Sequence, residues 1–158
     1  MELPYRKSPR IPDYDYSTEG YYFVTICTNE KKGVFWDGHE LNRFGRIAKN
    51  DLEALAAHYS RLRVDKYVIM PNHVHAIVAI GCDGKKGALP DLNEVIAQYK
   101  SGVSRKIHAP EPNKKVWQRS YHDRGIRSQM EYEKIWKYID TNPQRWTDDC
   151  FYEEPDTN

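Results

Sequence analysis

Residues 67–78 read YVIMPNHVHAIV, and this stretch decides the fold. Two runs rich in β-branched and apolar residues, at 64–70 and 73–80, are typical of β-strands. Only Pro71-Asn72 separates them, and so short a break leaves no room for a crossover connection. We therefore predict an antiparallel pair of strands joined by a tight turn.

Two histidines interrupt the second of these apolar runs. Side chains alternate between the faces of a strand, so His73 and His75 point to one face and Val74 to the other. Their Cα atoms would lie about 7 Å apart at the usual rise of a strand. Two imidazoles at this spacing can converge on one metal ion, although two polar residues on an exposed sheet face would give the same pattern.

Further elements are predicted on both sides of this strand pair. They are, in chain order, a strand at 21–28, a loop or short hairpin at 31–38, a helix at 42–59, the strand pair, a helix at 91–107, a strand within 116–126 centred on 117–121, and a helix at 128–141. Asp91, with Glu94 three residues later, is a typical helix start. Trp117 and Trp136 are expected to pack in the core.

The element order β-α-β-β-α-β-α predicts the α+β class. We expect a ferredoxin-like sandwich, a four-stranded antiparallel sheet with two packed helices, plus a C-terminal helix. The length of 158 residues fits a single domain over 1–158. Within it, residues 1–20 predict an irregular basic arm and 147–158 an acidic tail.

Charge is unevenly distributed along the chain. Apolar residues make up 39%, charged residues 30%, and the net charge is +1. Between positions 100 and 127 the acidic residues are only Glu111 and Asp123, while the basic ones are Lys100, Arg105, Lys106, Lys114, Lys115, Arg119, Arg124 and Arg127. Such a basic segment fits a surface that binds a polyanion, and it fits equally well a solvated charged face.

Several classes of protein are disfavoured by the sequence. The three cysteines have no paired spacing, so neither a disulfide framework nor a zinc finger is expected. No apolar run is long enough to span a membrane, and the first residues lack a signal-peptide core. We expect a cytoplasmic protein with no membrane partner.

A metal ion held by the histidine pair would need further ligands. At least one more protein ligand is required, and the positions then left open suit a catalytic ion rather than a structural one. Imidazole with an oxygen donor is compatible with Mn²⁺, whereas Mg²⁺ is unusual with histidine and is compatible only where phosphate oxygens fill its shell. Such an ion could polarise a phosphodiester for attack by water or by a side chain.

Two tyrosines on predicted helices are candidate nucleophiles, and periodicity separates them. Tyr99 lies in the middle of an apolar stripe and is expected in the core. Tyr138 lies on the flank of the stripe in the last helix, and Asn142, four residues later, lies on the same side. Tyr138 and Asn142 could therefore face the histidines, although an interface tyrosine and a helix-ending asparagine would look the same.

Four blocks of sequence together resemble a known family. They are RKSPR at 6–10 with YYFVTICT at 21–28, MPNHVH at 70–75, WQRSYHDRGIR at 117–127, and YIDTNP at 138–143. The chain resembles the REP-associated tyrosine transposases, relatives of the insertion-sequence 200/605 transposases within the HUH single-strand nucleases. The resemblance spans about residues 5–146.

This resemblance implies an activity and a set of site residues. His73 and His75 would match the metal-binding pair, Asn142 the third ligand, and Tyr138 the nucleophile, with Mg²⁺ or Mn²⁺ as cofactor. The family cleaves and rejoins single-stranded DNA beside hairpins, either REP-like or at element ends, through a 5′-phosphotyrosine link. By charge alone, the DNA-binding candidates are Arg6, Lys7, Arg10, Lys100, Arg105, Lys106, Arg119, Arg124 and Arg127.

Two other functions remain compatible with the sequence. A non-catalytic nucleic-acid-binding module of the same fold would bind DNA without cleaving it. A metal-dependent nuclease that uses water would cleave without a covalent intermediate. The sequence is compatible with a monomer or a homodimer.

Overall fold

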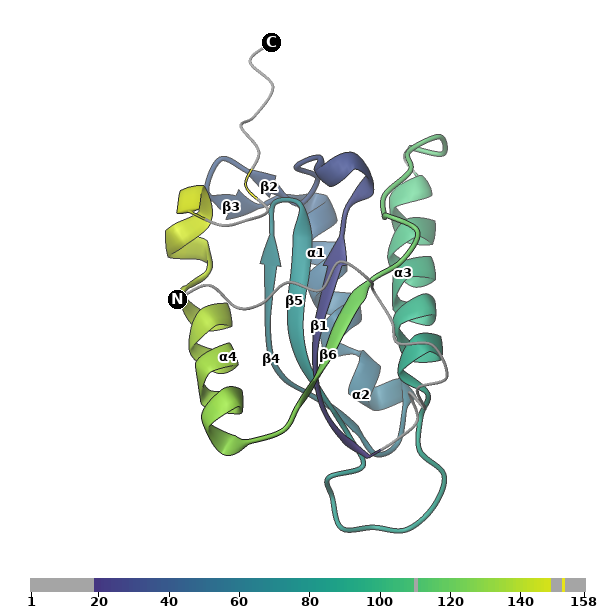
Figure 1. The fold of residues 1–158 in the computed structure, drawn as a ribbon. Helices are drawn as coiled ribbons and strands as arrows, with labels where there is room; N and C mark the ends of the chain where they lie inside the picture. Colours follow the sequence, from purple (N-terminus) through teal and green to yellow (C-terminus); the bar gives the residue numbers. More distant parts are fainter. Residues whose placement is uncertain (1–18, 110, 149–151, 153–158) are drawn as a thin grey trace.

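A four-stranded antiparallel sheet forms the centre of the computed structural model, which describes residues 19–109, 111–148 and 152. Its spatial order is β4-β5-β1-β6 (Figure 1). The strands are β1 (Gly20–Cys27), β4 (Leu62–Met70), β5 (His73–Ile80) and β6 (His122–Ile126). The predicted α+β architecture is confirmed. The basic arm with Arg6, Lys7 and Arg10, and most of the acidic tail, lie outside the described residues.

The predicted antiparallel pair is β4 and β5, joined by Pro71-Asn72. Main-chain hydrogen bonds from the segment after β1 hold this turn. The Pro71 carbonyl accepts from the Val34 N–H at 2.8 Å, and the Asn72 carbonyl accepts from the Thr28 N–H at 2.9 Å. The turn is therefore fixed, and with it the residue that begins β5.

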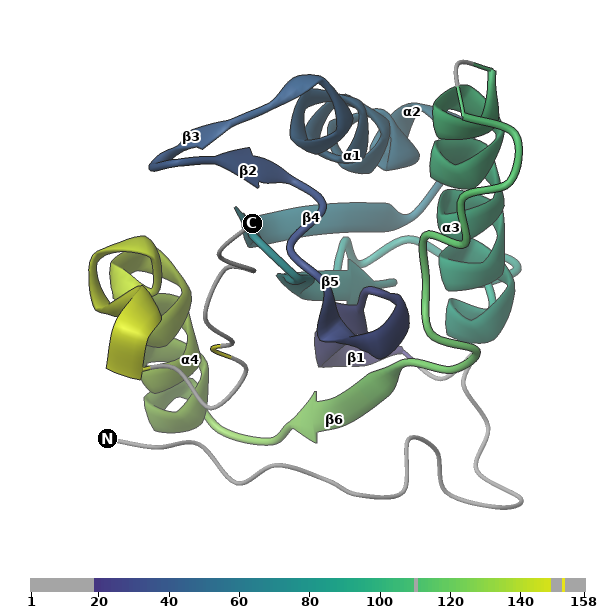
Figure 2. The same ribbon diagram turned by 90° about the horizontal axis from the view of Figure 1, so that it is seen from above.

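One face of the sheet is covered by α1 (Arg43–Glu53), α2 (Leu55–His58) and α3 (Leu92–His108), as Figure 2 shows. Asn42 and Asp91 cap α1 and α3 by accepting hydrogen bonds from main-chain N–H groups, as Asp91 was predicted to do. The prediction of one continuous helix over 42–59 is wrong in one respect. It divides at Ala54, whose N–H bonds to the carbonyls of both Asn50 and Leu52.

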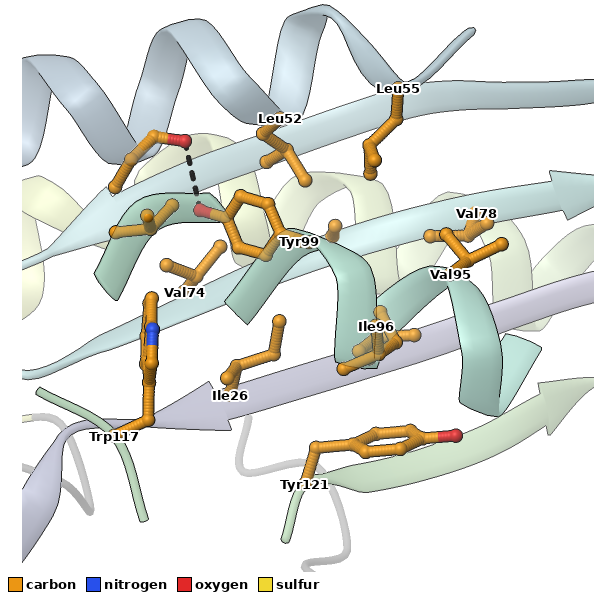
Figure 3. Close-up of a cluster of buried hydrophobic side chains, with 14 of the residues drawn as sticks. Ile26, Leu52, Leu55, Val74, Val78, Val95, Ile96, Tyr99, Trp117 and Tyr121 are labelled. Carbon is orange, nitrogen blue, oxygen red and sulfur yellow. Dashed lines mark hydrogen bonds between the residues drawn. The ribbon is translucent and has the colours of Figure 1, made fainter. Parts of the chain in front are cut away.

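The main hydrophobic core lies between this face and these helices (Figure 3). Ile26 of β1 and Val74 and Val78 of β5 meet Val95 and Ile96 of α3 there, and all are almost completely buried. Tyr99 is also buried, and its hydroxyl donates to the Ala48 carbonyl at 2.8 Å, which joins α3 to α1. The prediction that Tyr99 is a core residue is confirmed.

The opposite face of the sheet is covered by α4 (Gln129–Thr141) (Figures 1 and 2). Ser128 caps this helix by accepting from the Glu131 N–H. Ile135 and Ile139 of α4 pack on Phe23 and Ile77 in a second, smaller core. The remaining elements are β2 (Trp36–Asp37), β3 (Glu40–Leu41), and the short 3-10 helices η1 (Asn29–Lys31) and η2 (Pro143–Asp148).

Two predictions are corrected here. The last strand is centred at 122–126 and not at 117–121. Trp117 and Tyr121 resemble strand residues because they are buried, but they pack against α3, where they hydrogen-bond to the Lys100 carbonyl and the Asn93 side chain. Trp117 is a core residue as predicted, whereas Trp136 is 39% exposed.

Candidate active site

His73 and His75 lie on the face of β5 that α4 covers. Ile77, two residues further along β5, packs on α4, and residues two apart in a strand share a face. Both histidines are buried, and their ring centroids are 4.4 Å apart. The pair therefore points inward between the sheet and α4, and the alternative of two polar residues on an exposed face is excluded.

Each histidine has a hydrogen-bond partner at Nδ1. The Nδ1 of His73 is 2.8 Å from Asn72 Oδ1, and the Nδ1 of His75 is 2.9 Å from Thr25 Oγ1. The amide of Asn72 is oriented, because its Nδ2 donates to the Lys31 carbonyl. Nδ1 of His73 consequently carries the proton, and Nε2 keeps its lone pair. Histidine ligands of metal ions are oriented in this way by an outer partner.

The α4 helix brings Tyr138 and Asn142 to the histidines. The Tyr138 ring is 5.4 Å from the His75 ring and 6.2 Å from Phe23, and Tyr138 is half-buried. Asn142 follows the last residue of α4, is buried, and has its side chain close enough to His73 to raise the pKa of that imidazole. The four residues singled out in the sequence therefore meet in one place.

Burial determines the charge of His73. It lowers the pKa of this imidazole to about 3, and the neighbouring Asn142 side chain opposes the shift only in part. His73 is neutral at physiological pH, which is the form that binds metal ions.

The donor set fits a divalent ion with oxygen-rich coordination. Two imidazoles and an amide oxygen would supply three ligands, and substrate oxygens could complete the shell. Cys27 is the register partner of His73, yet among the described residues no three His, Cys, Asp or Glu side chains gather as a metal site. The arrangement therefore differs from a closed structural zinc site.

Residues near the site were missed by the sequence analysis. Asn72 was interpreted only as a break, and Thr25 only as part of a strand. His122 is the register partner of Thr25, so His75, Thr25 and His122 form a row across three strands. Trp146 of η2 lies with its ring 6.1 Å from that of His73. Only the pairing of strands and the path of η2 reveal these neighbours.

The basic candidates are spread over both faces. Lys100, Arg105 and Lys106 belong to α3, across the sheet from the histidines. Lys100 donates to the Gln118 carbonyl at 2.6 Å, and Lys106 pairs with Asp51 of α1. These contacts join elements of the fold.

The remaining described candidates lie elsewhere. Arg124 is on the α4 face of β6 and pairs with Glu131 at 2.5 Å. Arg127 lines a cleft at the start of α4, and Arg119 is exposed in the loop before β6. The structure thus brings none of the described basic candidates into the group formed by His73, His75, Tyr138 and Asn142.

Comparisons with known proteins agree with this architecture. The model of the family described as IS200-like transposases matches residues 16–142. An uncharacterised protein of Haemophilus influenzae is 32% identical over 172 residues, covering 95% of this chain and 94% of that protein. Because the family match covers most of the chain, this protein belongs to the IS200-like transposase family.

Two solved structures are similar in fold. A REP-associated tyrosine transposase bound to a REP hairpin matches with a TM-score of 0.56 and 16% identity, over 91% of this chain and 74% of that one. A presumed transposase from Deinococcus radiodurans R1 matches with a TM-score of 0.53 and 16% identity, over 84% of this chain and 97% of that one.

No helix in the described part of the chain is long and apolar enough to cross a membrane.

Proposed function

We propose that this protein is a metal-assisted tyrosine transposase that cleaves and rejoins single-stranded DNA beside hairpins. The observation that carries the proposal is the meeting of Tyr138, Asn142, His73 and His75 between β5 and α4. The family match and the structural similarity to a transposase bound to a REP hairpin support DNA as the partner.

Tyr138 is the nucleophile in this proposal. Its phenolic oxygen attacks the phosphorus, the bond from phosphorus to the 3′-oxygen breaks, and the 3′-oxygen leaves as a hydroxyl after taking up a proton. The phenolic proton is released. The product is a 5′-phosphotyrosine, and attack by a 3′-hydroxyl reverses these bond changes to rejoin strands. The phosphodiester energy is kept in the covalent link.

His73, His75 and Asn142 are the residues that would hold the divalent ion, Mg²⁺ or Mn²⁺. A bound ion supplies charge stabilisation to the phosphate oxygens. The protein's part is to orient both imidazoles through Asn72 and Thr25, and to keep His73 neutral through burial. The packing of Ile135 and Ile139 fixes α4, and with it the position of Tyr138. The same single domain supplies all four residues.

The test is incubation with labelled single-stranded DNA from the flanks of the protein's own gene, with Mn²⁺ or Mg²⁺, followed by a denaturing gel. We expect a covalent adduct that is absent in Tyr138→Phe and retained in the control Tyr132→Phe. Tyr132 lies on the same helix, but its hydroxyl donates to Asp65 at 2.8 Å.

Other results would overturn the proposal. Cleavage without an adduct would show a nuclease that uses water. Binding that survives both a chelator and Tyr138→Phe, with no cleavage of any hairpin substrate, would show a non-catalytic binding module. An adduct that persists in Tyr138→Phe would place the nucleophile elsewhere.

A further inference from the structure

A cleft adjoins the histidine site at the end of the sheet where β5 begins. It has a volume of about 870 Å³, within the range of ligand-binding clefts. Its walls come from η1 and the segment after it, the β2–β3 hairpin, the β4–β5 turn, the loop after α3, and η2. Figure 1 shows η2 and the β2–β3 hairpin at this same end of the sheet.

Two tryptophans line this cleft. The rings of Trp36 and Trp146 are 6.5 Å apart and inclined by 48°, and both are half-buried. The indole N–H of Trp36 donates to the Ile69 carbonyl at 2.7 Å, so this ring is fixed against β4. Partly exposed aromatic rings in a polar cleft suit the stacking of an unpaired base.

The charge of the cleft suits the phosphate backbone. Four lysines line it and one carboxylate opposes them: Lys31, Lys32, Lys114 and Lys115 against Glu30. Glu30 pairs with Lys32 at 3.4 Å, where both side chains are 68% exposed, and such a pair is weak in water. Lys114 is 4.0 Å from Glu111. The lining is therefore basic in a chain whose net charge is only +1.

Two residues belong to both the cleft and the histidine site. Asn72 lines the cleft and holds Nδ1 of His73. The Trp146 ring is 6.5 Å from that of Trp36 and 6.1 Å from that of His73, and the Tyr152 ring meets it edge-on at 5.2 Å. A base stacked on Trp146 would thus be one ring away from His73.

We propose that this cleft binds an unpaired nucleotide next to the scissile phosphate, with its base stacked on Trp146 and Trp36 and its backbone near Lys31 and Lys32. The position of this nucleotide next to the scissile phosphate rests on the proposed function, but its binding to the cleft can be measured without cleavage. Bases in a duplex are already stacked and paired, so the cleft selects single strands.

The experiment measures binding of a labelled single-stranded oligothymidylate of about 12 nucleotides, and of the matching duplex, to full-length Tyr138→Phe protein with a chelator. We expect Trp146→Ala to weaken single-strand binding about fivefold or more, the lower end of what stacking one base contributes. Trp146→Phe keeps a ring and should retain most of the affinity. Trp136→Ala is the matched control, since Trp136 is an exposed tryptophan of α4 that does not line the cleft.

The lysines are tested through salt dependence. Lys31→Gln with Lys32→Gln should lower the slope of log K against log salt by about 1.4, because each lost contact with single-stranded DNA removes about 0.7. Lys85→Gln with Lys86→Gln makes the same change in net charge in the exposed loop after β5, at the other end of that strand, and should leave the slope unchanged.

Three results would overturn the proposal: Trp146→Ala binding like Trp136→Ala, equal and Trp146-dependent binding of the duplex, or no binding of the single strand by the parent protein. Its failure is separable from that of the proposed function. An adduct in the wild-type protein together with unaltered binding by Trp146→Ala would refute the cleft alone. Trp146-dependent binding with no adduct would refute the tyrosine mechanism alone.

Discussion

The two faces of the central sheet are built from alternate residues of the same strands, yet they hold different chemistry. His73 and Val74 are neighbours in β5, and both are completely buried. Val74 is stabilised by apolar contacts with α3 and its surroundings, whereas His73 is held through its Nδ1 by a hydrogen bond with Asn72. Burial of a polar group is tolerated only where such partners compensate for lost water. One face therefore supports the fold, and the other combines packing with a site.

The sharpest way to break this comparison is to remove a histidine. His75→Ala should reduce strand cleavage roughly 10³-fold or more, because losing a direct ligand must exceed the 10–100-fold cost of losing an outer partner. Initial rates of adduct formation measure this. Ile77→Val, two residues along the same face of β5, is the control and should keep nearly full activity in the folded protein. Equal rates for His75→Ala and the wild type would refute the metal site.

Substitutions on the face of the sheet that α3 covers should lower the stability of the protein without changing the rate of adduct formation. Ile96→Ala removes a fully buried side chain of α3 and should lower the free energy of unfolding by about 2–5 kcal/mol. Denaturant unfolding measures the loss, and adduct formation at low temperature should continue in the folded fraction. If Ile96→Ala abolished activity in fully folded protein, the two faces would not be independent.

An outer partner should have a smaller effect than a ligand. Thr25→Val removes the hydroxyl next to Nδ1 of His75 and should weaken Mn²⁺ binding about 10–100-fold. Titration calorimetry with Mn²⁺ measures this. Tyr99→Phe also removes one buried hydroxyl, but on the other face of the sheet, and should leave Mn²⁺ binding unchanged. Equal losses in the two variants would point to a general effect on folding.

Acid should destabilise the metal-free protein through the buried histidine. The pKa of His73 is about 3 in the folded chain against 6.5 for an ordinary histidine, so between these values the unfolded chain takes up a proton that the folded one does not. The contribution of His73 to the free energy of unfolding is fully present above pH 6.5. It decreases as the pH falls towards 3, by at most about 1.4 kcal/mol per pH unit. Unfolding measured across this range with a chelator tests it. His73→Gln should flatten the dependence, and an unchanged slope in that variant would contradict the assignment.

The sequence predicted more of the fold than of the details around the site. Alternation in β5 was enough to place both histidines on one face, and helical periodicity was enough to separate Tyr99 from Tyr138. The strand predicted within 116–126 was placed too early: Trp117 forms only an isolated antiparallel bridge with Thr28, and the regular strand begins at His122. Trp136 was expected in the core because it continues the apolar stripe of α4. It is instead partly exposed at the edge of the contact between α4 and the sheet, with the Lys66 ammonium 5.0 Å from the centre of its ring.

What the sequence determined by itself were the properties that depend on neighbours along the chain: the hairpin at Pro71-Asn72, the shared face of the two histidines, and the position of Asn142 one turn after Tyr138. The tertiary structure alone decided which elements meet. Register across β1 and β5 set Thr25 beside His75, and the packing of Ile135 and Ile139 turned Tyr138 towards the histidines. It also placed Trp146 over His73. Contacts between distant segments depend on how strands pair and helices dock, and local periodicity carries no record of that choice.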